Sequence, residues 1–274
     1  HMSAAPFHLH LISDSTGETV STVARASMAQ FSVGDPAEHS WALVRSLEQI
    51  EKVLQSIRSH PGIVLYTLVK PELRHVLEAG CYELNVPCVD VLAGVMDVLS
   101  NTLGTEVQHT PGRQHALNSE YYNRIEAMQF VLAHDDGHAI DNLNKADVIL
   151  VGVSRTSKTP TCIYLANRGI KAANVPFVSN STFPEDRLAT STALVVALTT
   201  SPSRLVQIRR NRVIALKDLR SSEYTDLDMV RCEISDARRI FTRHDWPIID
   251  VSRRSIEETA AAILQLYRAI PEEI

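Results

Sequence analysis

Residues 147–160 read Asp-Val-Ile-Leu-Val-Gly-Val-Ser-Arg-Thr-Ser-Lys-Thr-Pro, an apolar run followed by a polar turn and a Lys-Thr-Pro sequence. The stretch matches the phosphate-loop pattern G-x-x-x-x-G-K-[ST] at every defined position except the second glycine, which is Ser157. The apolar residues predict a buried strand, and a helix is predicted from Lys158 onward. Pro160 suits the first turn of that helix, because the N–H it lacks has no intrahelical partner there. This order of elements predicts a loop that binds phosphate.

The expected contacts of the loop follow from the chemistry of phosphate. Backbone N–H groups at a helix N-terminus bind anions, and the helix dipole adds positive potential. Lys158 is predicted to place its charge on the terminal phosphates, Thr159 to bind Mg²⁺ through its hydroxyl, and Arg155 to add a bidentate contact. The predicted nucleotide-binding residues are Gly152, Val153, Ser154, Arg155, Thr156, Ser157, Lys158 and Thr159.

The alternative is a strand–turn–helix junction that contains a lysine by chance. Ser157 favours this alternative, because a glycine before the lysine normally adopts a backbone conformation that is disfavoured for other residues. The combination of strand, Gly152, Lys-Thr pair and helix favours phosphate binding.

Short apolar runs alternate with helical patterns on both sides of this loop, which predicts an α/β fold with mostly parallel sheets. A weak strand is predicted at Ser40–Val44. The pattern fails between Leu103 and Ser119, where glycine, proline and histidine interrupt a polar stretch. We predict an N-terminal α/β domain at residues 6–103, a linker or active-site loop and helix at 104–145, and a C-terminal P-loop-containing nucleotide-binding domain at 146–274.

One candidate acid follows the first predicted strand. Asp14 lies between an apolar run and a helix, where it could orient an attacking hydroxyl as a base or hold magnesium. The neighbouring hydroxyls and N–H groups could also bind phosphate. The alternative is ordinary helix capping by Ser15 or Thr16.

Two further acids, Asp135 and Asp136, follow the predicted helix at Glu120–Ala133. They suit metal binding or base catalysis, and the alternative is a glycine-capped helix end with solvated acids. Acids at a helix C-terminus oppose the macrodipole, which favours another purpose. The sequence does not settle which acid completes a metal shell.

Basic and histidine residues are weaker candidates. Arg209 and Arg210 lie in a predicted basic helix, and a solvated helix face is the expected environment of each. His109 and His115 flank the irregular Pro111–Arg113 stretch, and loop histidines are more often solvated than catalytic.

Composition restricts the partners of the chain. The formal net charge of −5 gives no general attraction to nucleic acid or an anionic membrane. No apolar run approaches the roughly 18–20 residues of a membrane span, and the N-terminus lacks the features of a signal peptide. The four cysteines have no metal-binding spacing and are expected to be reduced thiols of a cytoplasmic protein. The oligomeric state stays open, with a homodimer among the compatible arrangements.

Several segments in the same order resemble a known family. They are Leu11-Ile-Ser-Asp-Ser-Thr-Gly-Glu-Thr19, the loop at 152–160, Tyr122-Asn-Arg-Ile-Glu-Ala-Met-Gln-Phe130, His134-Asp-Asp-Gly137, Ala173-Asn-Val-Pro176, Pro247-Ile-Ile-Asp-Val-Ser252 and Ser255-Ile-Glu-Glu-Thr259. They resemble the dikinase regulatory proteins, the bifunctional kinase/phosphorylases of pyruvate, phosphate dikinase and of phosphoenolpyruvate synthase. The likeness spans nearly the whole chain, and this family accepts serine or glycine before the lysine.

The resemblance implies a serine/threonine kinase that uses ADP to phosphorylate and inactivate a dikinase. It also implies a reverse activity, in which inorganic phosphate removes the phosphoryl group and pyrophosphate is released. Thr-Ser-Lys-Thr at 156–159, followed by Ala-Asn-Val-Pro, is closer to the pyruvate, phosphate dikinase branch. An active site between the two halves is expected, with Lys158, Arg155, Mg²⁺ and an acid such as Asp14.

Two other functions fit the loop alone. The first is an ATP-dependent P-loop kinase of a small metabolite. The second is a non-catalytic nucleotide-sensing module that controls a partner by docking.

Overall fold

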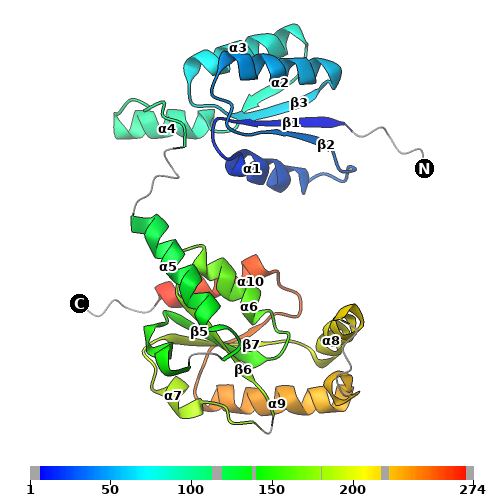
Figure 1. Cartoon of the computed structure of the whole chain (residues 1–274), viewed down its shortest axis with the longest axis vertical. Helices are drawn as coiled ribbons and strands as arrows, with labels where there is room; N and C mark the ends of the chain where they lie inside the picture. Colours follow the sequence, from blue (N-terminus) through cyan, green and yellow to red (C-terminus); the bar gives the residue numbers. More distant parts are fainter. Residues whose placement is uncertain (1–6, 113–118, 138–139, 180, 217–221, 270–274) are drawn as a thin grey trace. The chain divides into compact units, whose positions relative to one another are not determined.

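The computed structural model describes residues 7–112, 119–137, 140–179, 181–216 and 222–269. The chain divides into two compact units, His1–Ala116 and Leu117–Ile274 (Figure 1). Each unit contains helices and a sheet of four parallel strands, which confirms the predicted α/β fold class. The three-part division at residues 103 and 145 stays a prediction. In the described part of the chain, no helix is both long enough and apolar enough to span a membrane.

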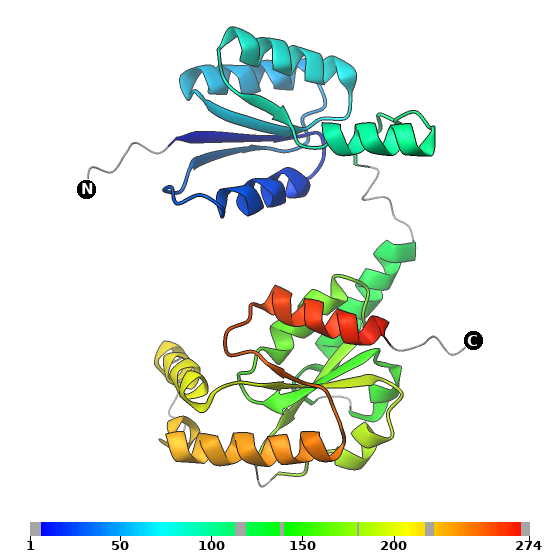
Figure 2. The same ribbon diagram turned by 180° about the vertical axis from the view of Figure 1, so that it is seen from behind.

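The N-terminal unit alternates strands and helices. Its elements are β1 (His8–Ser13), α1 (Glu18–Met28), β2 (Ala37–Trp41), α2 (Leu47–Ser59), β3 (Gly62–Thr67), α3 (Pro71–Glu83), β4 (Cys88–Asp90) and α4 (Ala93–Leu103). The strand order is β2-β1-β3-β4, and α1 lies on one face of the sheet with α2 and α3 on the other (Figure 2). Alternation along β1 explains these layers, because Leu9 and Leu11 pack with α1 while Ile12 packs with α2 and α3.

Strand β2 corrects one detail of the sequence prediction. A strand was expected at Ser40–Val44, but the paired residues are Ala37–Trp41. Leu43 has a φ of 57°, and the Val44 N–H bonds to the Ser13 carbonyl instead of continuing the ladder. The chain therefore leaves the sheet at the point where the apolar pattern had suggested that a strand begins.

The C-terminal unit is larger. Its elements are α5 (Ser119–Ala133), the 3₁₀ turns η2 (Asp135–Gly137) and η3 (Ile140–Lys145), β5 (Val148–Val153), α6 (Lys158–Ala166), β6 (Ala172–Phe177), α7 (Glu185–Ala189), β7 (Leu194–Thr199), α8 (Pro202–Leu216), η4 (Ser222–Thr225), α9 (Leu227–Arg243), β8 (Ile248–Asp250) and α10 (Ile256–Arg268). All six residues of β5 are buried, as expected of an apolar run in the middle of a parallel sheet.

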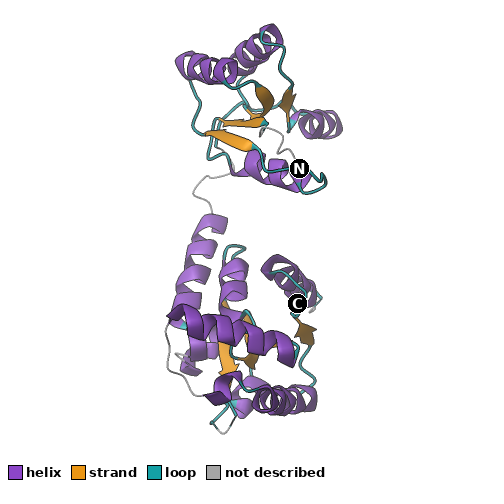
Figure 3. Cartoon of the chain, turned by 90° about the vertical axis from the view of Figure 1, so that its right-hand side faces the viewer, coloured by secondary structure: helices purple, strands orange, loops and turns teal. Residues whose placement is uncertain are grey.

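Helices cover both faces of the second sheet (Figure 3). Val148 and Leu150 pack with α5, α6 and α10, whereas Ile149 and Val151 pack with α8 and α9 on the opposite face. This three-layer arrangement buries both sides of β5 and leaves its carboxyl end at the edge of the sheet.

The strand order places that end where ligands commonly bind. The order is β6-β5-β7-β8, so β6 pairs on one side of β5 and β7 pairs on the other. Open parallel sheets bind ligands outside the carboxyl ends of strands at such a switch point. The predicted phosphate loop connects β5 to α6 at this position.

Candidate functional site

The loop between β5 and α6 has the backbone of a tight anion-binding turn. Arg155 and Ser157 both have positive φ angles, 73° and 61°. Gly152 is required by close packing, since a side-chain carbon at this position would lie 2.4 Å from the Leu198 carbonyl oxygen on β7. Ser157, the position that departs from the loop pattern, therefore adopts the left-handed conformation that a glycine would take.

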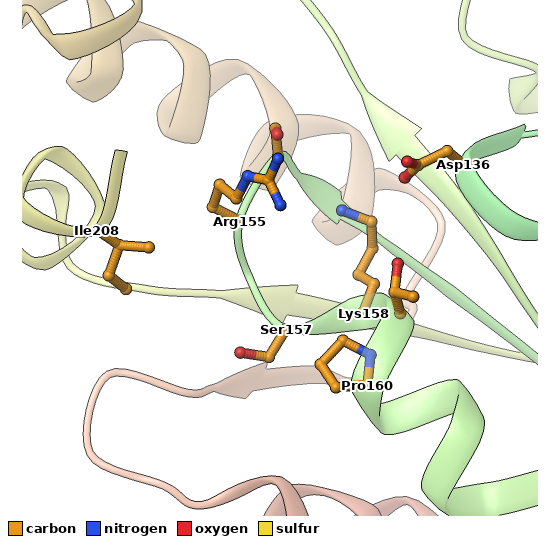
Figure 4. Close-up of a pocket in the computed structure, with 8 residues that line it drawn as sticks. Asp136, Arg155, Ser157, Lys158, Pro160 and Ile208 are labelled. Atoms are coloured by element: carbon orange, nitrogen blue, oxygen red, sulfur yellow. The ribbon is translucent and has the colours of Figure 1, made fainter. Parts of the chain in front are cut away.

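The loop borders a cavity of about 260 Å³ (Figure 4). Ser157 is the N-cap of α6 and makes no side-chain cap hydrogen bond. The backbone N–H groups in the first turn of α6 are thus not satisfied by a side-chain cap, which suits an anionic ligand. The residues that line the cavity are Asp136, Ser154, Arg155, Ser157, Lys158, Thr159, Pro160 and Ile208.

Lys158 is the buried cation of this site. Its side chain points toward the cavity between Arg155 and Asp136 in Figure 4, and the residue is only 5% exposed. The Nζ atom donates a hydrogen bond to the Val153 carbonyl oxygen at 2.9 Å. Burial lowers the pKa of Lys158 to about 8, against the raising effect of the nearby Asp136 carboxylate. An arriving phosphate would supply the negative charge that stabilises this ammonium group.

Thr159, Asp135 and Asn174 form a hydrogen-bonded network beside the loop. The Thr159 hydroxyl donates to Asp135 Oδ1 at 2.8 Å, and the Asn174 amide donates to Thr159 Oγ1 at 3.1 Å. Asn174 also donates to Asp135 Oδ1. The structure thus brings the predicted metal-binding hydroxyl beside one of the predicted acids.

This donor set fits magnesium. Mg²⁺ prefers oxygen ligands and is commonly held by one or two carboxylates, waters and the phosphates of a substrate. Thr159 and Asp135 offer a hydroxyl and a carboxylate oxygen at one point. Within the described residues, no cluster of three or more histidine, cysteine or acidic side chains forms a metal cage.

Asp135 and Asp136 have different environments although they are adjacent. Asp136 has a φ of 51°, is exposed and lines the cavity. The turn that carries both acids is held in place by His134, whose ring stacks on Phe130 with centroids 3.8 Å apart. The His134 carbonyl oxygen also accepts a hydrogen bond from the Asn174 backbone N–H at 3.3 Å. Asp135 is therefore held by hydrogen bonds, whereas Asp136 is the solvent-exposed acid of the pair.

Arg209 corrects a second prediction. It was expected on a solvated helix face, but it is 2% exposed, whereas Arg210 is exposed as predicted. Arg209 Nη1 donates to Glu233 at 2.8 Å, and Nη2 donates to the Ser154 carbonyl oxygen of the loop at 3.3 Å. Its guanidinium lies 4.4 Å from the centroid of the Tyr224 ring. Arg209 therefore links α8, α9 and η4 to the phosphate loop.

The helical spacing of apolar residues contains a signal for the burial of Arg209. Leu205 and Val206 on the same helix are buried, and Arg209 follows them at the i+4 and i+3 positions that share a helix face. Asn174 and Tyr224 were also missed as site residues. For Asn174 the signal was a polar residue within the strand-forming segment Ala172–Phe177.

Asp14 belongs to the N-terminal unit, so its predicted role beside the nucleotide stays a prediction. It is 2% exposed, and its Oδ2 atom accepts a hydrogen bond from the Val69 N–H at 2.7 Å. Burial raises the pKa of Asp14 above its ordinary value. Gly17 is the N-cap of α1 and makes no side-chain cap hydrogen bond, but the Glu18 N–H donates to the Thr16 hydroxyl at 3.5 Å, so part of the capping alternative also holds.

Of the two loop histidines, His109 contacts the backbone that follows β3. The His109 ring nitrogen Nδ1 lies 2.7 Å from the Val69 carbonyl oxygen, to which it donates in the appropriate tautomer. His115 lies outside the described residues.

Comparison with known sequences shows the family. Residues 9–264 match the kinase/pyrophosphorylase family. The chain belongs to this family. A relative from Caulobacter vibrioides is 52% identical over 263 residues, which cover 96% of this chain and 84% of the relative. A relative from Rhizorhabdus wittichii is 51% identical over 97% of this chain and 98% of its own length. One from Novosphingobium aromaticivorans is 49% identical over 95% and 93%, and all three are named as pyruvate, phosphate dikinase regulatory proteins.

Membership of the kinase/pyrophosphorylase family agrees with the geometry of the site. A left-handed turn at a helix N-terminus, a buried lysine and a hydroxyl–carboxylate pair are groups of the kind that bind phosphates in phosphoryl-transfer enzymes. The predicted family resemblance is confirmed over nearly the full length of the chain.

Proposed function

We propose that this kinase/pyrophosphorylase controls pyruvate, phosphate dikinase in both directions. It transfers a phosphoryl group from ADP to a threonine of the dikinase and thereby inactivates it. With inorganic phosphate as co-substrate, it removes the same group and releases pyrophosphate. The observation that carries the proposal is the network of Thr159, Asp135 and Asn174 beside the loop lysine, in a chain whose relatives carry the dikinase regulator name.

In the kinase direction, the threonine hydroxyl attacks the β-phosphorus of ADP. A new O–P bond forms, the bond between this phosphorus and the bridging oxygen breaks, and AMP leaves. Asp136 lines the cavity and is the acid placed to take the hydroxyl proton, while Asp135 is already engaged by Thr159. Lys158 and Arg155 stabilise the negative charge on the moving group.

In the reverse direction, an oxygen of inorganic phosphate attacks the phosphorus of phosphothreonine. The P–O bond to threonine breaks, pyrophosphate forms, and the threonine oxygen recovers a proton. Thr159 and Asp135 would hold a magnesium ion, which supplies charge neutralisation of the phosphates when bound. The same loop then serves two nucleophiles, so one set of residues catalyses both activities.

The test uses purified pyruvate, phosphate dikinase with its catalytic histidine phosphorylated, together with the full-length protein, magnesium and ADP. Mass spectrometry then looks for phosphothreonine on the dikinase, with ATP alone as the comparison. Phosphothreonine that appears with ADP is the expected result. The modified dikinase, once isolated, should release its phosphate as pyrophosphate when inorganic phosphate is added.

The variant Lys158→Ala should lose both activities, and loss of only one would contradict a shared site. If phosphoenolpyruvate synthase were phosphorylated and the dikinase were not, the synthase would be the protein substrate. Turnover of ATP with a small metabolite in the absence of a protein substrate would contradict the proposal and indicate a metabolite kinase. Inhibition of the dikinase without phosphate incorporation would indicate a nucleotide-sensing docking module.

A further inference from the structure

A second cavity lies in the N-terminal unit, at the carboxyl ends of β1 and β3. Its volume is about 220 Å³, with polar residues that follow β1 on one side and Leu92 and Met96 among its apolar residues. In this sheet β2 pairs on one side of β1 and β3 pairs on the other. The cavity therefore occupies the switch point of its sheet, the same kind of position that the phosphate loop occupies in the other unit.

The turn after β1 repeats the backbone design of the turn after β5. β1 ends at Ser13 and the N-cap of α1 is Gly17, while β5 ends at Val153 and the N-cap of α6 is Ser157. Both N-caps thus lie four positions after the strand, and both are left-handed, with φ angles of 82° and 61°. Neither N-cap residue makes a side-chain cap hydrogen bond, although the Glu18 N–H of α1 donates weakly to the Thr16 hydroxyl at 3.5 Å. The first turn of α1, a helix of 11 residues, therefore offers N–H groups as α6 does.

Two largely buried residues, Ser15 and Thr67, line this cavity, and within the described part of the chain their hydroxyls have no hydrogen-bond partner. Ser15 is 8% exposed and Thr67 is 7% exposed. Thr67 pairs in register with Ser13, so the two strand ends place their hydroxyl groups at one edge of the sheet. Both hydroxyls are open to the cavity and could donate hydrogen bonds to a ligand with acceptor oxygens.

Charges around the cavity also differ from those of the phosphate loop. The Ser15 hydroxyl and an Arg45 guanidinium nitrogen both lie next to Gly112, because a side-chain carbon built there would be 3.5 Å from the first and 3.8 Å from the second. Arg45 therefore supplies positive charge near the cavity. Glu18 follows the N-cap at the position that corresponds to Lys158. Asp14 is buried, which raises the pKa of its carboxyl, and in its ionised form it repels an anion in the cavity. These features predict weaker binding than at the lysine-containing loop.

We propose that this cavity is a second oxyanion site, which binds inorganic phosphate or the phosphate group of a phosphothreonine side chain. The N–H groups of α1 and the hydroxyls of Ser15 and Thr67 are the donors, and Arg45 is the cation. Leu92 and Met96 provide an apolar wall for the methyl group of a threonine. The phosphothreonine arm rests on the proposed function, whereas binding of inorganic phosphate does not.

The test is a residue-resolved titration of the full-length protein by NMR. Selective ¹⁵N labelling of glycine gives ten signals, one for each glycine, so that Gly17 reports on the second site and Gly152 on the phosphate loop. Inorganic phosphate, phosphothreonine amide and threonine amide are titrated separately. The Gly17 signal should shift with the two phosphate compounds and not with threonine amide. A tighter response to phosphothreonine than to inorganic phosphate would identify the side chain as the ligand.

Two variants should change the affinity at Gly17 in opposite directions. Thr67→Val removes one donor and should weaken binding roughly three- to tenfold. Asp14→Asn removes a negative charge while retaining an acceptor for Val69, and should tighten binding about threefold or more. Thr102→Val on the exposed face of α4 is the matched control and should change nothing.

A Gly17 signal that stays fixed at phosphate concentrations that saturate Gly152 would overturn the second site and leave the proposed function standing. Equal affinities at Gly17 for the wild type, Thr67→Val and Asp14→Asn would also overturn it. A Gly152 signal that stays fixed while Gly17 moves would instead count against the phosphate loop.

Discussion

Lys158 shows how a single buried charge is prepared for a ligand. Its ammonium group has a backbone carbonyl as its hydrogen-bond partner, and burial lowers its pKa from 10.5 to about 8. A nucleotide phosphate beside it would raise that pKa again, because an opposite charge favours the protonated form. Nucleotide binding and protonation of Lys158 are therefore linked.

This linkage predicts how nucleotide affinity depends on pH. Below about pH 8 the free protein already carries the proton, so affinity should be nearly constant. Above about pH 8 each binding event must first protonate Lys158, and affinity should fall by up to about tenfold per pH unit. Calorimetric titration of ADP between about pH 7.5 and 9.5 measures this directly.

Lys158→Arg is the control for the pH profile. A guanidinium stays protonated over this range, so the variant should bind ADP with an affinity that does not depend on pH, whatever its absolute value. An affinity that stays constant in the wild type up to about pH 9.5 would contradict the assignment of a buried, ligand-linked lysine.

At the scale of elements, Arg209 joins α8, α9 and η4 to the loop between β5 and α6. Its pairing with Glu233 is almost fully buried, with side-chain exposures of 3% and 16%. Removal of one member of a buried pair leaves the other charge uncompensated, which costs about 3–5 kcal/mol. Arg209→Gln should therefore destabilise the protein by about 3 kcal/mol and weaken ADP binding, because the Ser154 carbonyl loses its donor.

The neighbouring residue provides a matched control on the same helix. Arg210 is exposed, so Arg210→Gln should change the free energy of unfolding by no more than about 0.5 kcal/mol. Urea denaturation of the three proteins gives the comparison. Equal stabilities for the two variants would show that Arg209 contributes no more than a surface charge.

The same elements show how far sequence reasoning reached. The apolar run at β5 predicted a central parallel strand because such strands are buried on both faces. The loop residues are contiguous, so any turn of the right type brings them together. The Asp135–Asn174 contact joins residues 39 positions apart, and the Arg209–Ser154 contact joins residues 55 apart. No local pattern determines which strand end meets which turn, so these contacts required the tertiary structure.

At the scale of the whole molecule, the two units repeat the same sheet topology. Both units have the strand order second–first–third–fourth, and in both a helix with a left-handed N-cap residue follows the first strand. Each unit also has hydrophobic cores made of its own residues. The sequence predicted two α/β halves but gave no indication that their sheets are wound identically, because β1 and β5 share few residue types.

Separate cores predict that a packing defect acts within its own unit. Gly152→Ala places a carbon 2.4 Å from the Leu198 carbonyl oxygen and should destabilise the β5–β7 pairing by about 2 kcal/mol or more. Gly94→Ala meets no atom within 4 Å on α4 and should stabilise that helix by about 0.5–1 kcal/mol. Hydrogen exchange measured by mass spectrometry should show faster exchange in Gly152→Ala for β5, β6 and β7 and unchanged exchange for β1 and β3. Equal acceleration in both sheets would mean that the two units unfold as one cooperative body.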